Sequence, residues 1–322
     1  MQGLMQDWPL LIHRIIDHAA IQHGGRKVIS RSIEGPIHTT DYASIRRRAL
    51  KVAQRLARDG IRNGDRVATL AWNTWRHLEA WYGIMGIGAV YHTVNPRLFP
   101  DQIAWIVNHA EDRIIFADIT FAPIIEELIG KCPKLERVVF MTDAAHMPSL
   151  TPKGPPFSSY RGQACYEDLI KGAPTACTWG DFEENTAAGL CYTSGTTGNP
   201  KGVLYSHRST MLHSIMASNG AVIPMDPDTT LLPVVPMFHA NAWGLVYAAP
   251  MCGGKLVFPG PKLDGASVYE LLDKEQVTLS AGVPTVWLAL LDYCAQNKLT
   301  MSSVKRTLIG GSAVPLAMIE RF

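Results

Sequence analysis

A dense run of hydroxyl, glycine and lysine residues occupies Tyr192–Ser209, with the sequence YTSGTTGNPKGVLYSHRS. Glycines permit positive φ and close backbone approach, so successive N–H groups can form an anion site. Lys201 adds a positive charge, which at ~4 Å from a phosphate gains roughly 4 kcal/mol before desolvation, with an effective dielectric constant of about 20. The run therefore predicts a phosphate-binding loop. Its donors are four hydroxyls, three glycines and one lysine: Thr193, Ser194, Thr196, Thr197, Gly195, Gly198, Gly202 and Lys201.

Two alternatives to this interpretation fit the residues less well. The spacing from Gly195 to Lys201 matches a Walker A loop, but Pro200 has no N–H to donate. Gly202 stands where a Walker loop has the Ser or Thr that holds magnesium, and the following GVLYS predicts a strand rather than a helix. A P-loop phosphotransferase is therefore disfavoured. A plain Gly/Ser/Thr-rich surface hairpin does not need so many such residues around one lysine.

The elements that must position this loop follow a mixed α/β pattern. Apolar residues at helical spacing predict a helix over 41–59, with Gly60 as its stop, and a buried strand over 66–71. Strands and helices then alternate, which indicates largely parallel, mixed sheets covered by helices. Further helices are predicted over 74–87, 101–110, from 207, 265–275 and 283–296, and further strands over 89–94, 113–117, 187–193, 203–206, 255–258, 277–281 and 307–309.

Length and composition narrow the class of protein. The 322 residues are enough for about two domains, and we place them at 1–185 and 186–322, the second holding the glycine loop. The Pro-rich stretch 143–159 predicts a surface loop. Hydrophobic residues make up 47% and charged residues 18%, which is typical of a globular protein. The net charge of +2 gives no support for binding to nucleic acid.

Cysteine spacing and apolar stretches bear on metal sites and location. The six cysteines form no CxxC pair, so a zinc ribbon or a dithiol redox motif is not expected, nor is a structural metal site. The N-terminus has no signal-peptide pattern, and the apolar stretches 80–91 and 282–291 are shorter than the roughly 20 residues of a membrane span. We therefore expect a cytoplasmic protein. The arginine-rich face of helix 41–59 is interpreted as a solvated face rather than a membrane or nucleic-acid patch.

The string Tyr192–Gly202 resembles the phosphate loop of the adenylate-forming superfamily, which comprises acyl-CoA synthetases, luciferases and peptide-synthetase adenylation domains. Its signature is Y/F-T/S-S-G-S/T-T-G-x-P-K-G. Val234–Trp243 (VVPMFHANAW) is similar to the family's block with the acyl-site histidine, and Gly310–Pro315 (GGSAVP) is similar to the loop that walls the adenine. Together with PGPKLD at 259–264 and AGVPTVW at 281–287, these sequence motifs are most similar to those of bacterial medium- and long-chain fatty-acyl-CoA synthetases.

The resemblance implies the N-terminal subdomains of the adenylate-forming fold and a two-step reaction. A fatty-acid carboxylate attacks the α-phosphorus of ATP to give acyl-AMP and pyrophosphate, and the thiolate of coenzyme A then displaces AMP. ATP and Mg²⁺ are the implied cofactors, coenzyme A is the co-substrate, and catalysis rests on positioning and charge stabilisation. Two alternatives stay open: an aryl- or short-chain acid–CoA ligase, and a nucleotide-binding fragment without turnover.

The resemblance also assigns roles to residues that match the family's motifs. Lys201 and His239 would be catalytic, with His239 near the acyl carboxylate, and Thr193 would lie near magnesium. Trp243 would be a gate between the ATP pocket and the fatty-acid tunnel. A structural histidine at 239 and a core aromatic at 243 are the alternatives. ATP would be held at its phosphates by Thr193, Ser194, Gly195, Thr196, Thr197, Gly198 and Lys201, and along its adenine by Gly310, Gly311 and Ser312.

The sequence departs from the family's pattern after GGSAVP. The Tyr-Gly-x-Thr-Glu block with its magnesium glutamate should follow, together with the ribose aspartate, the hinge and a C-terminal domain with its catalytic lysine. The resemblance therefore implies an N-terminal part of a longer enzyme, whose second subdomain is incomplete. We expect the 322-residue chain to fold but to be catalytically silent alone. The resemblance also implies a homodimer, while the charge and the apolar stretches predict no nucleic-acid partner and no transmembrane segment and leave peripheral membrane contact open.

Overall fold

The structure is a computed structural model that describes residues 1–322 apart from residues 2, 6, 178 and 194–198. Its α-helices are α1 (His13–Gln22), α2 (Tyr42–Arg58), α3 (Trp75–Gly86), α4 (Pro100–Ala110), α5 (Ala122–Ile129), α6 (Tyr166–Ile170), α7 (His207–Ala217), α8 (Leu245–Cys252), α9 (Gly265–Lys274), α10 (Pro284–Asn297) and α11 (Leu316–Ile319). Its short 3₁₀ segments are η1 (Ile119–Phe121), η2 (Ala144–His146) and η3 (Ala240–Gly244).

The strands are β1 (Lys27–Arg31), β2 (Ile37–Asp41), β3 (Arg66–Leu70), β4 (Val90–Thr93), β5 (Ile114–Ala117), β6 (Arg137–Phe140), β7 (Gln163–Cys165), β8 (Ala187–Thr193), β9 (Lys201–Ser206), β10 (Thr230–Pro233), β11 (Lys255–Phe258), β12 (Leu279–Gly282) and β13 (Arg306–Ile309). The helices and strands predicted above all have counterparts here, with ends that differ by at most two residues. The predicted loop 143–159 is irregular except for η2.

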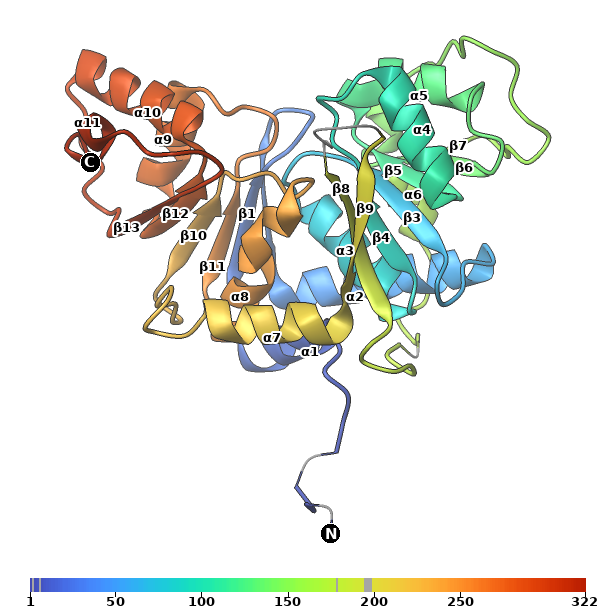
Figure 1. Ribbon diagram of the computed structural model, residues 1–322, viewed down its shortest axis with the longest axis horizontal. Helices are drawn as coiled ribbons and strands as arrows, with labels where there is room; N and C mark the ends of the chain where they lie inside the picture. The colour runs from blue at the N-terminus through green and yellow to red at the C-terminus, as the bar shows by residue number, and fades with distance from the viewer. Residues whose placement is uncertain (2, 6, 178, 194–198) are drawn as a thin grey trace.

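Two sheets lie side by side with helices on their faces (Figure 1). In the described residues, six strands form one sheet in the order β13-β12-β10-β11-β1-β2, and seven form the other in the order β7-β6-β5-β3-β4-β8-β9. Only the pairs β1–β2 and β8–β9 are antiparallel among these. The predicted mixed, largely parallel α/β architecture is therefore confirmed.

Each sheet takes strands from both sides of the predicted boundary between residues 185 and 186. β1 and β2 precede the boundary, yet they pair within the sheet of β10–β13. β8 and β9 follow it, yet they extend the sheet that starts with β3. The boundary therefore does not separate the two sheets, and the strands that flank the glycine loop belong to the sheet built mainly from the N-terminal half.

A continuous apolar core joins the two sheets. Helices α1, α2, α3 and α8 lie between them and bury large side chains such as Trp81, Tyr82 and Tyr247 against strands of both. On the outer faces, α4 and α5 cover β5 and β6, while α9 and α10 cover β10–β12. This packing fixes β8 and the edge strand β9 relative to the segment between β10 and α8, where the predicted site residues lie.

The arginine-rich helix α2 is only partly solvated as predicted. Arg47 and Arg58 are exposed, whereas Arg46, Arg48 and Arg55 are half-buried and pair with acidic side chains. These ion pairs account for Arg46, Arg48 and Arg55. Among the helices that the structure describes, none has both the length and the apolar character needed to cross a bilayer.

Candidate active site

The predicted phosphate loop joins two antiparallel strands at an edge of the seven-stranded sheet (Figure 1). β8 ends at Thr193 and β9 begins at Lys201, and these two residues face each other in the ladder. The Thr193 hydroxyl lies 3.5 Å from the carbonyl oxygen of Lys201. A strand rather than a helix thus follows the loop, as predicted, which sets it apart from a Walker A loop. Five predicted phosphate-binding residues lie outside the described residues: Ser194, Gly195, Thr196, Thr197 and Gly198.

Lys201 is placed where its charge is available to a ligand. Its side chain and that of Thr193 are exposed. Within the part of the chain that the structure describes, no carboxylate or hydrogen-bond acceptor engages the Lys201 ammonium. An unpaired cation beside a glycine loop is what an anionic group such as a phosphate would attract.

The block that resembles the acyl site contains an unusual left-handed turn. The five residues of η3, Ala240–Gly244, all have positive φ, from 44° at Ala240 to 71° at Gly244. Four of them are not glycine, and a non-glycine residue in this conformation costs roughly 1–2 kcal/mol. Such strain persists only where surrounding contacts hold it, and it concentrates at functional sites.

Three contacts hold the turn. The buried Asn241 side-chain oxygen accepts a hydrogen bond from the Cys191 thiol at 3.1 Å. The ring nitrogen Nε2 of His213 donates to the Trp243 carbonyl oxygen at 3.0 Å. The Trp243 indole packs against Gly310, where a Cβ atom would lie 3.0 Å from Cη2. The structure therefore brings together β8, the histidine block and the predicted adenine-wall loop.

The remaining predicted residues lie around this turn. His239 directly precedes it and is exposed. Gly310 follows β13 and donates its N–H to the Gly282 carbonyl oxygen at 3.3 Å. Gly311 and Ser312 are exposed, and Gly311 has φ of +88°, a conformation that favours glycine. A side chain at Gly310 would be in tight contact with the indole of Trp243, so the indole would have to shift to make room for it.

A pocket of about 420 Å³ opens beside the turn. This volume is within the range of small-molecule sites. Thr210 contributes to its lining, and its buried hydroxyl has no hydrogen-bond partner in the described part of the chain. The pocket is lined by Tyr205, Ser209, Thr210, His213, Ala240, Asn241, Trp243 and Gly244.

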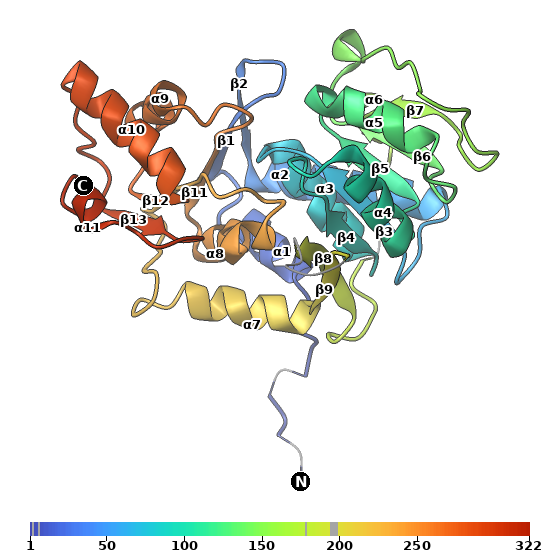
Figure 2. The same ribbon diagram turned by 45° about the horizontal axis from the view of Figure 1, so that its top comes forward.

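Helix α7 supplies the residues that the sequence analysis missed. The Ser206 hydroxyl caps this helix by accepting from the Ser209 N–H at 3.0 Å. Ser209, Thr210 and His213 then share one face of the helix, since residues three and four apart are neighbours. Figure 2 shows α7 running beside the β8–β9 hairpin and α8. The spacing of these polar residues, directly after the phosphate hairpin, was the signal that could have identified them.

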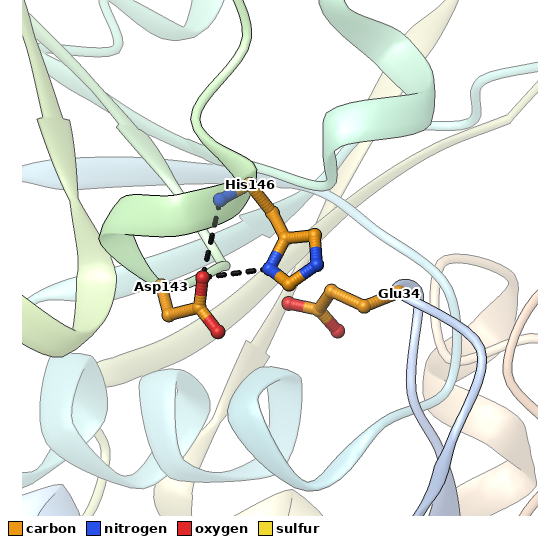
Figure 3. Close-up of side chains that lie close together, drawn as sticks. All are labelled: Glu34, Asp143 and His146. Atoms are coloured by element: carbon orange, nitrogen blue, oxygen red, sulfur yellow. Dashed lines mark hydrogen bonds and ion pairs between the residues drawn. The ribbon is translucent and has the colours of Figure 1, made fainter.

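A separate group of ligand-type side chains lies away from this pocket. Glu34, Asp143 and His146 offer ligand atoms within 4.8 Å of one another (Figure 3). The three residues belong to none of the motifs identified in the sequence. The Glu34 carboxylate is already engaged, because Arg76 and the Thr142 hydroxyl both donate to it at 2.7 Å. A cation there would compete with the Arg76 guanidinium, so the group carries no argument for a metal site.

Comparison with known proteins decides the family. Residues 16–322 match the family described as AMP-binding enzyme. The chain belongs to the AMP-binding enzyme family. This AMP-binding enzyme is 47% identical over 322 residues to the medium-chain-fatty-acid–CoA ligase of Ectopseudomonas oleovorans, with 100% of this chain and 58% of the relative covered. It is 45% identical over 322 residues to the 3-methylmercaptopropionyl-CoA ligase of Ruegeria pomeroyi, with the same coverage.

The chain thus spans about 58% of the length of these curated relatives. Its fold is also similar to a crystal structure of the anthranilate CoA ligase AuaEII in complex with anthranoyl-AMP, with a TM-score of 0.81 at 21% identity. That match covers 98% of this chain and 58% of the other chain. The resemblance stated from the motifs, and the fold class, are therefore confirmed.

Proposed function

We propose that this AMP-binding enzyme supplies the ATP- and acid-binding part of an AMP-forming fatty acid–CoA ligase. The observation that carries the proposal is the shared wall between its two candidate sites. Cys191 lies near the end of β8, two residues before Thr193, and its thiol donates a hydrogen bond to Asn241 in the pocket lining. An acid in the pocket and a nucleotide on the hairpin would therefore approach each other, as transfer of an adenylyl group to a carboxylate requires.

In this proposal the chain binds and orients rather than forming a covalent intermediate. Lys201 and the loop hydroxyls hold the β- and γ-phosphates, and Gly310, Gly311 and Ser312 lie along the adenine. The acid's carboxylate oxygen, near His239, forms a bond to the α-phosphorus as the bond to pyrophosphate breaks. Coenzyme A thiolate then displaces AMP.

Magnesium would enter this reaction together with ATP. The exposed Thr193 hydroxyl fits a role beside the ion, since a neutral oxygen is a ligand that Mg²⁺ accepts. The ion would neutralise charge on the phosphates during transfer. The chain's own contribution here is to fix that hydroxyl at the end of β8, opposite Lys201.

A second candidate is a short-chain acid–CoA ligase. The relative named as a 3-methylmercaptopropionyl-CoA ligase is almost as similar as the one named for medium-chain fatty acids, at 45% against 47% identity. The pocket also carries several polar side chains, among them Thr210 and His213. We place fatty acids first because the more similar relative is named for them, and coenzyme A as the acceptor in both cases.

The proposal is tested by exchange of labelled pyrophosphate into ATP, with butyrate, octanoate, palmitate or benzoate. Exchange is measured for this chain alone, which is expected to be silent, and for this chain fused to the C-terminal part of the medium-chain-fatty-acid–CoA ligase relative, which decides the result. Acid-dependent exchange supports adenylation, and the acid that gives the fastest exchange separates the two candidates. Because this exchange needs only ATP and acid, it does not depend on coenzyme A. Tight ATP binding with no acid-dependent exchange would favour a nucleotide-binding role without turnover.

The predicted gate gives a further test. We expect Trp243→Ala to strengthen octanoate binding without ATP by about fivefold, equivalent to ~1 kcal/mol, because loss of the half-buried indole would open the proposed gate to the fatty-acid tunnel. Calorimetric titration of octanoate with and without ATP measures this, with Trp243→Phe as a control that keeps an aromatic wall. Equal octanoate affinity in wild type and both variants would make Trp243 a packing residue.

A further inference from the structure

Two buried side chains beside the pocket have no task in the reaction above. Cys191 of β8 and Asn241 of the left-handed turn are 8% and 5% exposed. The sequence analysis singled out neither of them. Each nevertheless contacts a segment that the proposed reaction uses, since Cys191 leads into the phosphate loop and Asn241 lines the pocket.

The hydrogen-bond chain through Cys191 links three elements. The Thr93 hydroxyl of β4 lies 3.0 Å from the Cys191 sulfur, which in turn lies 3.1 Å from the Asn241 side-chain oxygen. Burial raises the pKa of the Cys191 thiol. The group is therefore an S–H at neutral pH, and it can donate to Asn241 while the Thr93 hydroxyl donates to the sulfur or to the Leu190 carbonyl oxygen.

The hydrogen bond between Cys191 and Asn241 joins the strand before the phosphate loop to the left-handed turn. Residues two apart on a strand share a face, so Cys191 lies on the same face of β8 as Thr193. Asn241 is the second residue of a turn whose non-glycine residues all have positive φ. Without a side-chain anchor such a turn would relax towards right-handed conformations, and Trp243, two residues further along, would leave its place in the pocket wall.

We propose that Cys191 and Asn241 are positioning residues that hold the left-handed turn, and with it Trp243, so that the strand leading into the phosphate loop sets the shape of the acid pocket. The inference rests on the proposed function for the identity of the ligand. The anchoring itself rests only on the geometry of the turn. The affinity for longer acids should depend most on this anchoring, because longer acids would reach furthest past the Trp243 side chain in the pocket wall.

The anchoring is tested first without any ligand. Cys191→Ala removes the donor, Cys191→Ser replaces it with a hydroxyl, and Cys294→Ala removes a buried thiol in α10, away from the turn. The Ala242 N–H, which donates to the His239 carbonyl oxygen at 3.2 Å, reports on the turn in hydrogen–deuterium exchange. We expect about fivefold faster exchange at 239–245 in Cys191→Ala, the effect of one lost hydrogen bond, and wild-type exchange in the other two.

The second measurement is the ratio of octanoate to butyrate affinity by calorimetry. We expect this ratio to rise about fivefold in Cys191→Ala and to return to the wild-type value in Cys191→Ser. If Cys191→Ala does not fold, Asn241→Gly removes the acceptor while tolerating the positive φ, and the same shift is expected. A general loss of packing would lower the affinity of both acids and would also occur in Cys294→Ala.

The two measurements separate failure of the anchor from failure of the proposed function. Equal exchange at 239–245 in Cys191→Ala and Cys191→Ser overturns the positioning role, whatever acids bind. Faster exchange with an unchanged octanoate-to-butyrate ratio overturns the link between the turn and the pocket. A wild-type chain that binds neither acid contradicts the proposed function, and with it the role of these residues in shaping an acid pocket, while the exchange result still reports on the turn.

Discussion

Replacing Lys201 with alanine should weaken the binding of Mg-ATP by about 1.5–3 kcal/mol, or about 10- to 150-fold, the range for hydrogen bonds to charged groups. The side chain stands at the start of β9, opposite Thr193, and no acidic group of the described residues neutralises it. Its charge is therefore free to meet a phosphate. Because Lys201 is exposed, the substitution should leave the fold intact.

Calorimetric titration of Mg-ATP with this chain measures the effect. Lys201→Arg keeps the charge and should recover most of the affinity, whereas Lys171→Ala removes an exposed lysine outside the site and should not change it. AMP, which lacks the β- and γ-phosphates, should bind the wild type and Lys201→Ala with similar affinity. An unchanged ATP dissociation constant in Lys201→Ala would exclude this lysine from the phosphate site.

The largest effect on stability is expected from Arg76→Met, at about 3–5 kcal/mol, because removing one partner of a buried ion pair leaves an uncompensated charge. The Arg76 side chain is 9% exposed. It donates to Glu34 at 2.7 Å, to Glu167 at 2.8 Å and to the Met141 carbonyl oxygen at 3.0 Å. Methionine has a similar length but none of these donors, so two carboxylates would lose a partner.

The pH dependence of this effect follows from the carboxylates. Burial opposes ionisation of Glu34, but the Thr142 hydroxyl and the Arg76 guanidinium outweigh it and hold the pKa of Glu34 below its ordinary value. A carboxylate whose pKa is lower in the folded than in the unfolded state stabilises the fold at pH values above its unfolded-state pKa. This stabilisation is lost as the pH falls and the carboxylate is protonated. The free-energy difference between wild type and Arg76→Met should therefore shrink as the pH falls below about 4.3, the ordinary pKa of a glutamate.

Urea unfolding of both proteins across this pH range measures the difference. Arg47→Met is the matched control, because Arg47 is exposed and its side chain donates only to the Ser44 hydroxyl within the described residues. It should lower the free energy of unfolding by less than about 0.5 kcal/mol, as is usual for surface positions. A loss below about 1 kcal/mol for Arg76→Met at neutral pH would show that the pairs contribute no more than exposed ones do.

Local signals in the sequence were sufficient for most elements of the fold. The helix over 41–59 combines apolar spacing with a cap, and the structure shows the Asp41 carboxylate accepting from the Ser44 N–H at 2.8 Å. The phosphate hairpin was predictable because GVLYS follows the lysine as a β-prone run. Strand order was not predictable in this way. β1 pairs with β11, more than two hundred residues later in the chain, and no local pattern encodes that partner.

The candidate site was predicted in its parts but not in its connections. The motifs indicated Lys201, His239 and Gly310, yet the bond between Cys191 and Asn241 spans 50 residues and has no sequence signature. The left-handed turn was equally hidden, because only the last of its five residues, Gly244, is a glycine that could indicate positive φ. Such a turn exists only through its tertiary contacts, and these become visible only in the folded chain.

Binding of a non-hydrolysable acyl-adenylate analogue tests the central claim most directly, since this ligand must occupy the nucleotide site and the acid pocket together. The analogue is an octanoyl sulfamate ester of adenosine, titrated by calorimetry into this chain beside AMP and octanoate alone. The account predicts that the analogue binds at least a hundredfold more tightly than either part, in the range expected when two linked sites are filled at once. It also predicts that Trp243→Ala changes the affinity for the analogue but not for AMP. An analogue that binds no more tightly than AMP, or whose affinity Trp243→Ala leaves unchanged, would contradict a shared site for the nucleotide and the acid.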